Sequence, residues 1–332
     1  MKICICGGGN LGHVCAGFLA NRGQQVSILT TQPERWTSEL KIIAPDKTFR
    51  GKLASVTSKP DEVIPQAEMI LLCLPGFAIH NELVSIKPYL TKDCIVGSVV
   101  ASTGFFFEAL EELPTDIPLF GFQRVPFISR IIEYGKEAEL KGYKETLHVA
   151  IENTIGKEPI RKELEKVFEK PVSLAKSFYE VSLSNSNPLL HPARLYTMWK
   201  DWRPGIVYSR NPQFYTEWTI EASKLLIQMD EEFQQLLIVL GLELGCIPTI
   251  LDYYESNDAV SLTQKLHDIK AFQGILSPMK ETPDGFVPDL ASRYFSEDFP
   301  YGMRFIVETA HKQDVNIPTI EKVYQWGASM LK

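Results

Sequence analysis

Short apolar runs alternate with helical patterns along the first half of the chain. Met69–Leu74 is apolar throughout, which is typical of a strand in a parallel sheet that helices cover on both faces. The other predicted strands are Lys2–Cys6, Gln25–Thr30, Cys94–Val100, Leu119–Phe122, Leu147–Ile151 and Val172–Leu174, and helical patterns cover Ile79–Leu90 and Ile160–Glu169. This alternation predicts an α/β domain with a doubly wound sheet over residues 1–176.

The second half has the spacing of helices. Apolar residues between Phe214 and Leu240 recur at helical intervals over about seven turns, which predicts one long core helix without a chemical role. Shorter helices are expected over Leu262–Ile275, Met303–Gln313 and Pro318–Met330, and a loop over Ser277–Pro288. Residues 177–332 are therefore predicted to form an all-α C-terminal domain.

A glycine-rich segment follows the first predicted strand directly. Gly7-Gly8-Gly9-Asn10-Leu11-Gly12 has the pattern G-x-G-x-x-G, and a helix and a second strand follow within about 30 residues. Such glycines permit a tight turn and a close approach of the backbone to a pyrophosphate, which the helix N-terminus also attracts. The sequence predicts a dinucleotide site made by Gly7, Gly9, Asn10, Leu11 and Gly12, with Pro75 beside it. The alternative is a glycine turn that packs a helix and binds nothing.

The end of the second strand indicates which dinucleotide is bound. An acidic residue there would bind the ribose hydroxyls of NAD. This chain has Thr30-Thr31-Gln32-Pro33-Glu34-Arg35 instead, so two hydroxyls and a nearby cation replace the acid. Thr31 and Arg35 favour the 2′-phosphate of NADP(H) over NAD(H). In the alternative, Glu34 binds the ribose and Arg35 is only a solvated charge.

Composition narrows the class of protein. The net charge is −7 and no run of Lys and Arg occurs, so neither nucleic acid nor an anionic membrane is an expected partner. The cysteines form no CxxC pair, and most lie in apolar runs, which is typical of reduced core residues in a cytoplasmic protein. No signal peptide pattern is visible, and the longest apolar run is too short to cross a bilayer. No metal site is expected, because the histidines lack partners at metal-ligand spacing.

Two polar motifs in the second half are candidates for chemistry. Asn187-Pro188-Leu189-Leu190-His191-Pro192 contains an imidazole, which can donate or accept a proton near neutral pH. Taken alone, Asn-Pro and His-Pro are also typical of helix starts and turns. The second motif is Arg293-Tyr294-x-x-Glu297-Asp298-x-Pro300-Tyr301-Gly302. Its simplest alternative is a surface ion pair between Arg293 and Asp298.

With Gln123-x-x-Pro126-Phe127 and the glycine segment, these motifs make the chain resemble the octopine/nopaline (opine) dehydrogenase family over nearly its whole length. Members of that family condense an amino acid with a 2-oxo acid and reduce the resulting imine with NAD(P)H. The resemblance implies a Rossmann-type domain, a helical domain and a site in the cleft between them. It places the family histidine at His191 and its carboxylate partner at Asp298.

The implied reaction suits these residue types. An imidazole can move the proton that accompanies hydride transfer, and a carboxylate on its far nitrogen fixes the tautomer and stabilises the imidazolium. Arg293 is the candidate for a bidentate contact with a substrate carboxylate, and Gln123 and Asn187 are candidates for substrate hydrogen bonds. Asp298 can act only if the fold returns it to His191, which the sequence does not show.

Two other functions fit parts of the sequence. Ketopantoate reductases resemble the first domain but use a lysine as proton donor, for which Lys176 is the candidate. A non-catalytic NADP(H)-binding sensor would need only the first domain. The sequence does not determine the amino acid, the 2-oxo acid, the preferred direction or the oligomeric state, for which a homodimer is the candidate.

Overall fold

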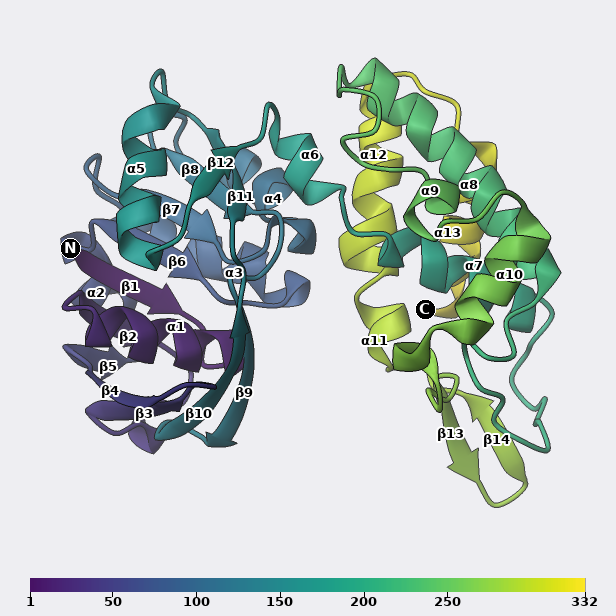
Figure 1. Ribbon diagram of the computed structural model, residues 1–332, viewed down its shortest axis with the longest axis horizontal. Coiled ribbons are helices and arrows are strands. Elements are labelled where there is room, and N and C mark those ends of the chain that lie inside the picture. The colour runs from purple at the N-terminus through teal and green to yellow at the C-terminus, as the bar shows by residue number, and fades with distance from the viewer. Residues whose placement is uncertain (332) are drawn as a thin grey trace. The chain divides into compact units, whose positions relative to one another are not determined.

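The structure, a computed structural model, describes residues 1–331. Within this range the chain forms two compact units, Met1–Ser184 and a second unit that begins at Asn185 (Figure 1). The boundary follows the short helix α6 (Phe178–Ser182), so the division lies slightly beyond residue 176.

The first unit is built on an eight-stranded sheet with the strand order β12-β11-β8-β7-β6-β1-β2-β5. Its strands are β1 (Lys2–Cys6), β2 (Gln25–Leu29), β5 (Ser55–Thr57), β6 (Met69–Leu72), β7 (Ile95–Ser98), β8 (Leu119–Phe122), β11 (Leu147–Glu152) and β12 (Val172–Leu174). Neighbouring strands are parallel except β8 and β11. The connections reverse direction at β1, which lies between β2 and β6, and the doubly wound prediction is confirmed.

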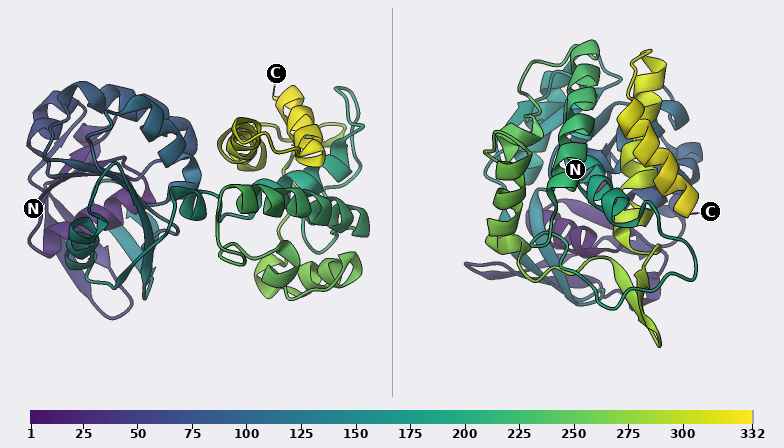
Figure 2. Two further views of the ribbon diagram at one scale, coloured as in Figure 1. Left: turned by 90° about the horizontal axis from the view of Figure 1, so that it is seen from above. Right: turned by 90° about the vertical axis from the view of Figure 1, so that its right-hand side faces the viewer.

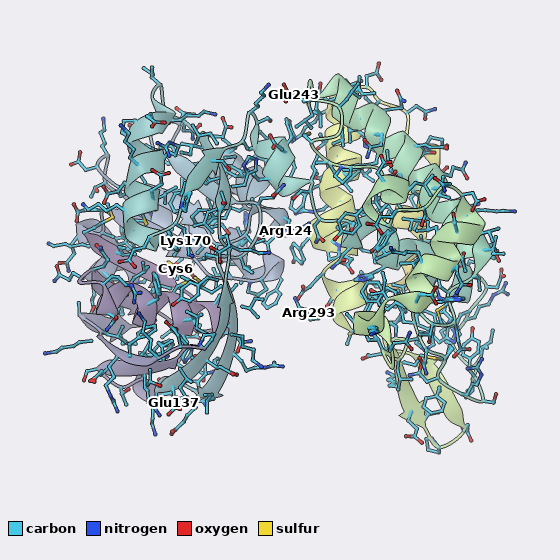
Figure 3. The ribbon with its side chains drawn as sticks, in the orientation of Figure 1. Cys6, Arg124, Glu137, Lys170, Glu243 and Arg293 are labelled. Carbon is cyan, nitrogen blue, oxygen red and sulfur yellow. The ribbon has the colours of Figure 1, made fainter. Side chains whose placement is uncertain are left out.

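Helices cover both faces of this sheet. Ile3 and Ile5 of β1 belong to the core under α1 (Asn10–Asn21) and α5 (Lys157–Phe168), whereas Cys4 and Cys6 belong to the core under α3 (Gly76–Ile86) and α4 (Phe105–Glu112). Successive side chains of a strand point to opposite faces. The apolar runs of the sequence are therefore strands buried on both sides, and Cys6 lies inside the unit (Figure 3).

A second, four-stranded sheet was not predicted. It has the order β4-β3-β10-β9 and consists of β3 (Glu39–Ile43), β4 (Thr48–Lys52), β9 (Phe127–Glu133) and β10 (Glu137–Tyr143). It packs against α1 on the side away from the large sheet (Figure 1). Gly51 permits this contact, because a Cβ atom there would lie 2.9 Å from Cα of Gly17 in α1. α1 is thus held between two sheets.

The second unit is helical, as predicted. Its helices are α7 (Asn187–Trp199), α8 (Ile220–Val239), α9 (Ile250–Tyr253), α10 (Ala259–Asp268), α11 (Arg293–Ser296), α12 (Arg304–Lys312) and α13 (Pro318–Met330). The loop predicted over residues 277–288 is instead a hairpin of β13 (Met279–Thr282) and β14 (Gly285–Pro288), which projects from the helices (Figures 1 and 2). Gly285 has φ of +135°, a conformation that favours glycine at the turn. Within residues 1–331, no helix has the length and apolar character needed to cross a membrane.

The long helix predicted from Phe214 onward begins later than expected. α8 starts after Thr219, whose side chain accepts a hydrogen bond from the N–H of Ala222 at 3.2 Å. Residues 213–218 form a loop, yet Phe214, Tyr215 and Trp218 are buried in it. Burial without helical structure explains the wrong boundary, because the loop repeats the apolar spacing of the helix.

Candidate functional site

The glycine segment has the geometry that a dinucleotide requires. Gly7 has φ of +113°, and a Cβ atom there would lie 2.7 Å from the carbonyl oxygen of Cys73. A Cβ atom on Gly12 would overlap the carbonyl oxygen of Gly7, so packing alone requires both glycines. Gly9 differs, since nothing lies within 4 Å of the position of its Cβ atom. This open space lies directly before α1, where the first N–H groups of the helix are available to a phosphate.

A cavity of about 500 Å³ adjoins this segment. It lies beyond the carboxyl ends of β1, β2 and β6, where doubly wound sheets bind their ligands. Of the residues predicted to hold the cofactor, four line it: Gly7, Gly9, Thr31 and Pro75. Leu11 packs against the core, and Gly12 packs against Gly7. The residues present therefore fit a dinucleotide.

Two side chains tie the glycine segment to the β9–β10 hairpin. The Asn10 side-chain oxygen accepts a hydrogen bond from the N–H of Ile131 at 2.8 Å. His13 Nε2 accepts the N–H of Gly135 at 2.7 Å, so Nδ1 carries the proton and donates to the carbonyl oxygen of Gly9 at 3.0 Å. Burial lowers the pKa of His13, which favours this neutral form.

The same hairpin contributes Tyr134, which belongs to no recognisable sequence motif. Tyr134 lines the cavity, and its hydroxyl lies 2.5 Å from the position of a Cβ atom on Gly8. The guanidinium of Arg35, which lies in the short 3₁₀ turn η1 (Pro33–Arg35), stacks 4.2 Å from the centre of the Tyr134 ring and donates to the Gln32 side chain at 2.6 Å. Arg35 is exposed near the cavity but does not line it.

In the helical unit, the fold brings His191 and Asp298 together. His191 Nδ1 lies 2.8 Å from Asp298 Oδ2, and His191 Nε2 lies 2.9 Å from the hydroxyl of Tyr215. An ionised Asp298 accepts from Nδ1–H, so Nε2 is the acceptor and Tyr215 donates to it. Both acidic and imidazole side chains are mostly enclosed, with exposures of 14% and 12%. In this arrangement a proton can be held at Nδ1, between the imidazole and Asp298, and at Nε2, between the imidazole and Tyr215.

Local structure explains how this contact forms across 107 positions of sequence. Pro188 lies in the first turn of α7, as the Asn-Pro pattern indicated, and places His191 one turn further along. Asp298 directly precedes a π-helical turn, η6 (Phe299–Met303). A Cβ atom on Gly302 in that turn would lie 2.5 Å from Cγ of Pro188, so glycine permits η6 to pack against α7. His191-Pro192 is not a turn, because both residues lie within α7.

Arg293 pairs with Glu297 and not with Asp298, the partner that the alternative interpretation of the motif suggested. Its Nε and Nη2 atoms donate to Glu297 at 2.8 and 2.7 Å, and the partner is therefore not Asp298. The side chain extends from α11 with 83% exposure (Figure 3). Asn187 is exposed at the start of α7, where its N–H donates to the Asn185 side chain. In the first unit, Gln123 follows β8 and its N–H bonds to the carbonyl of His148.

Comparisons with known proteins match each half of the chain to a family model. Residues 174–331 match the family model of the NAD/NADP octopine/nopaline dehydrogenase α-helical domain, and residues 3–102 match that of ketopantoate reductase. The octopine dehydrogenase of Mizuhopecten yessoensis is 28% identical over 98% of this chain and 89% of its own. The opine dehydrogenase of Haliotis discus hannai is 28% identical over 100% of this chain and 90% of its own.

A solved octopine dehydrogenase structure has the same fold as this chain. An octopine dehydrogenase determined with NADH and L-arginine matches 100% of this chain and 89% of its own, with 26% identity and a TM-score of 0.87. The chain is thus similar over its whole length to octopine and opine dehydrogenases, and residues 174–331 match their α-helical domain. These similarities indicate an NAD(P)-dependent dehydrogenase that acts on a CH–NH group, with a Rossmann-type first unit and a helical second unit.

Gly9→Val tests the cofactor site of this enzyme. The open space around Gly9 should accept the side chain without unfolding the protein, while the branched chain fills the position expected for the pyrophosphate. We expect NAD(P)H binding, followed by nicotinamide fluorescence, to be lost while the thermal unfolding temperature stays unchanged. Gly156→Val is the matched control, because Gly156 also precedes a helix, α5, without a positive φ. Normal binding by Gly9→Val would show that the segment is only structural.

Proposed function

We propose that this enzyme condenses an amino acid with a 2-oxo acid and reduces the resulting imine, with His191 as the acid–base catalyst and Asp298 as the residue that orients it. The observation that supports these roles is the 2.8 Å contact between the imidazole and the carboxylate. Asp298 stabilises the imidazolium that forms when His191 takes a proton, and it fixes the orientation of the ring, whose other nitrogen bonds to the Tyr215 hydroxyl. A nicotinamide cofactor held at the glycine segment would supply the hydride, and His191 supplies or removes the accompanying proton.

We propose NADP(H) as the preferred cofactor. Three features support this choice: no acid ends β2, Thr31 lines the cavity, and Arg35 lies close to it on the Tyr134 ring. Arg35 retains N–H groups that could bind a 2′-phosphate, because within residues 1–331 its guanidinium makes one hydrogen bond, to the Gln32 side chain. Thr30 and Gln32 stand where the acid of an NAD site would be expected. An octopine dehydrogenase structure contains NADH and a yersinopine dehydrogenase structure contains NADP+, so the proposed preference rests on the residues of this chain alone.

Arg293, Gln123 and Asn187 are the proposed substrate ligands. Glu297 engages one edge of the Arg293 guanidinium, and the remaining N–H groups could bind a substrate carboxylate. Gln123 lies at the carboxyl end of β8, on the edge of the sheet that carries the glycine segment. Asn187 has an exposed amide one turn before His191. The proposed substrates are small molecules, and a homodimer remains a prediction.

A ketopantoate-type reductase is the second candidate, because its family model matches residues 3–102. The match ends before the helical unit, whose residues match the opine family instead. Lys176, the candidate proton donor of such a reductase, lies in the first unit, and its backbone N–H donates to the Glu180 side chain. A non-catalytic sensor would not require the His191–Asp298 contact.

Dependence on an amine separates these functions. We expect NADPH oxidation with a 2-oxo acid such as pyruvate to require an added amino acid, because the imine forms only from both substrates. A panel of amino acids and 2-oxo acids, assayed singly and in pairs, measures this requirement. Equal rates with the 2-oxo acid alone would indicate a ketopantoate-type reductase. Tight NADPH binding without turnover would indicate a sensor.

The His191–Asp298 pair can be tested by a double-mutant cycle. We expect His191→Ala to lower kcat roughly 10²–10⁴-fold, the usual range for a lost acid–base group, with little change in the Kd of NADPH. Asp298→Asn should also lower kcat, and the double variant should lose far less than the product of both effects. Asp284→Asn, on an exposed turn, is the control. Multiplicative losses would show that the two residues act separately.

Arg35→Ala tests cofactor preference. Removal of the cation should raise the Kd of NADPH, while the Kd of NADH should change little because NADH lacks the 2′-phosphate. Arg130→Ala provides the control, since this arginine is exposed on β9 of the same unit. Equal losses for both cofactors, or a wild type that prefers NADH, would contradict the proposal.

A further inference from the structure

Tyr215 occupies the one nitrogen of His191 that Asp298 leaves available. The phenol hydroxyl lies 2.9 Å from Nε2, and Asp298 lies 2.8 Å from Nδ1, so both ring nitrogens have partners. A substrate can exchange a proton with this imidazole either by displacing Tyr215 or through its hydroxyl. We propose that Tyr215 is a catalytic residue that relays protons between His191 Nε2 and the nitrogen and oxygen atoms of the reacting substrates. This inference rests on the proposed function.

The surroundings of Tyr215 oppose its displacement. Its ring stacks on Phe272 with a centroid separation of 4.0 Å and an interplanar angle of 17°, and lies parallel to the Trp218 ring at 6.2 Å. Only 5% of the residue is exposed. A rotation away from His191 would therefore break an aromatic stack and expose apolar surface.

Hydrogen bonds also fix the loop that carries Tyr215. The N–H of Phe214, its neighbour, donates to the carbonyl of Ile275 at 2.8 Å. Arg194, which is 4% exposed, donates from Nη2 to the carbonyl of Glu217 at 2.6 Å. The indole N–H of Trp218 donates to Ser223 in α8 at 3.0 Å. The loop is thus attached to α7 and α8, and the hydroxyl stays directed at His191.

A phenol in this position can accept and donate at the same time. Its O–H is used by Nε2, and its lone pairs remain for an N–H or O–H group of a substrate. The pKa of Tyr215 is raised, mainly by burial and further by Tyr294, Tyr254 and Asp298, so a free phenolate is disfavoured. The two proton movements should therefore be concerted.

The protons balance over the condensation. The ammonium group of the amino acid gives a proton to the Tyr215 oxygen while the phenol proton moves to Nε2, which leaves a nucleophilic amine, an unchanged phenol and an imidazolium held by Asp298. The amine attacks the carbonyl carbon of the 2-oxo acid, the π electron pair of the C=O bond moves to oxygen, and a proton passes from the nitrogen to that oxygen to give the neutral carbinolamine. The relay then runs in reverse and protonates the hydroxyl of the carbinolamine, whose C–O bond breaks to release water and form the iminium ion. His191 ends neutral, as it began.

Tyr215→Phe tests the relay, because it keeps the stacked ring and removes only the hydroxyl. We expect kcat for the condensation to fall at least tenfold, with the Kd of NADPH unchanged. The histidine limb of the pH profile of kcat/KM should move to higher pH, since loss of the donor to Nε2 removes a contact that favours neutral imidazole. The solvent isotope effect on kcat should also decrease, because fewer protons move together. Tyr253→Phe, which removes a hydroxyl from a 54% exposed ring in the same unit, is the matched control.

The outcomes are distinct. The relay is overturned if Tyr215→Phe keeps kcat within about twofold of the wild type and has an unchanged pH profile. If the wild type still shows amine-dependent turnover, the proposed function remains intact. A higher kcat in the variant would also overturn the relay, because the hydroxyl would then be an obstacle. Absence of amine-dependent turnover in the wild type would overturn both the relay and the proposed function.

Discussion

The contact between His191 and Asp298 constrains the whole helical unit. It requires α7 and the turn after α11 to pack together, and glycine at position 302 makes room for Pro188 at their crossing. An ionised carboxylate and an imidazole that are both largely shielded from water need one another, since an unpaired buried polar group is costly. The same crossing leaves Nε2 directed at the loop before α8, where Tyr215 meets it.

The sequence predicted the large sheet and most helices because their signals are local. A run such as Met69–Leu74 is apolar on both faces, so it identifies a covered strand without knowledge of its partners. The second sheet was missed because β9 is mostly exposed and its strands pair across distant segments. The start of α8 was placed wrongly because Phe214, Tyr215 and Trp218 are buried at helical spacing without being helical.

The site was predictable where chemistry follows a motif. The glycine segment, His191 and Asp298 belong to such motifs. The structure places Gly7 and Gly9 beside a cavity, and it brings His191 and Asp298 within 2.8 Å of one another. Tyr134 and Tyr215 have none, since each is an aromatic residue in a turn or loop that tertiary packing carries to its position. The partner of Arg293 could not be predicted from the sequence either. Glu297 and Asp298 are adjacent, and the backbone geometry decides that Glu297 faces the guanidinium.

His13 makes the phosphate-binding segment depend on a part of the chain far from it. One ring nitrogen accepts an N–H from the β9–β10 turn, and the other donates to the residue that precedes α1. The ring makes both hydrogen bonds only in the neutral tautomer with the proton on Nδ1. A second proton, on Nε2, would place two donors against each other, because Gly135 also presents an N–H there. The small sheet therefore helps to position the nucleotide site and is more than an addition to the doubly wound core. A change of length in its hairpin would be transmitted to the glycine backbone before it disturbed the large sheet.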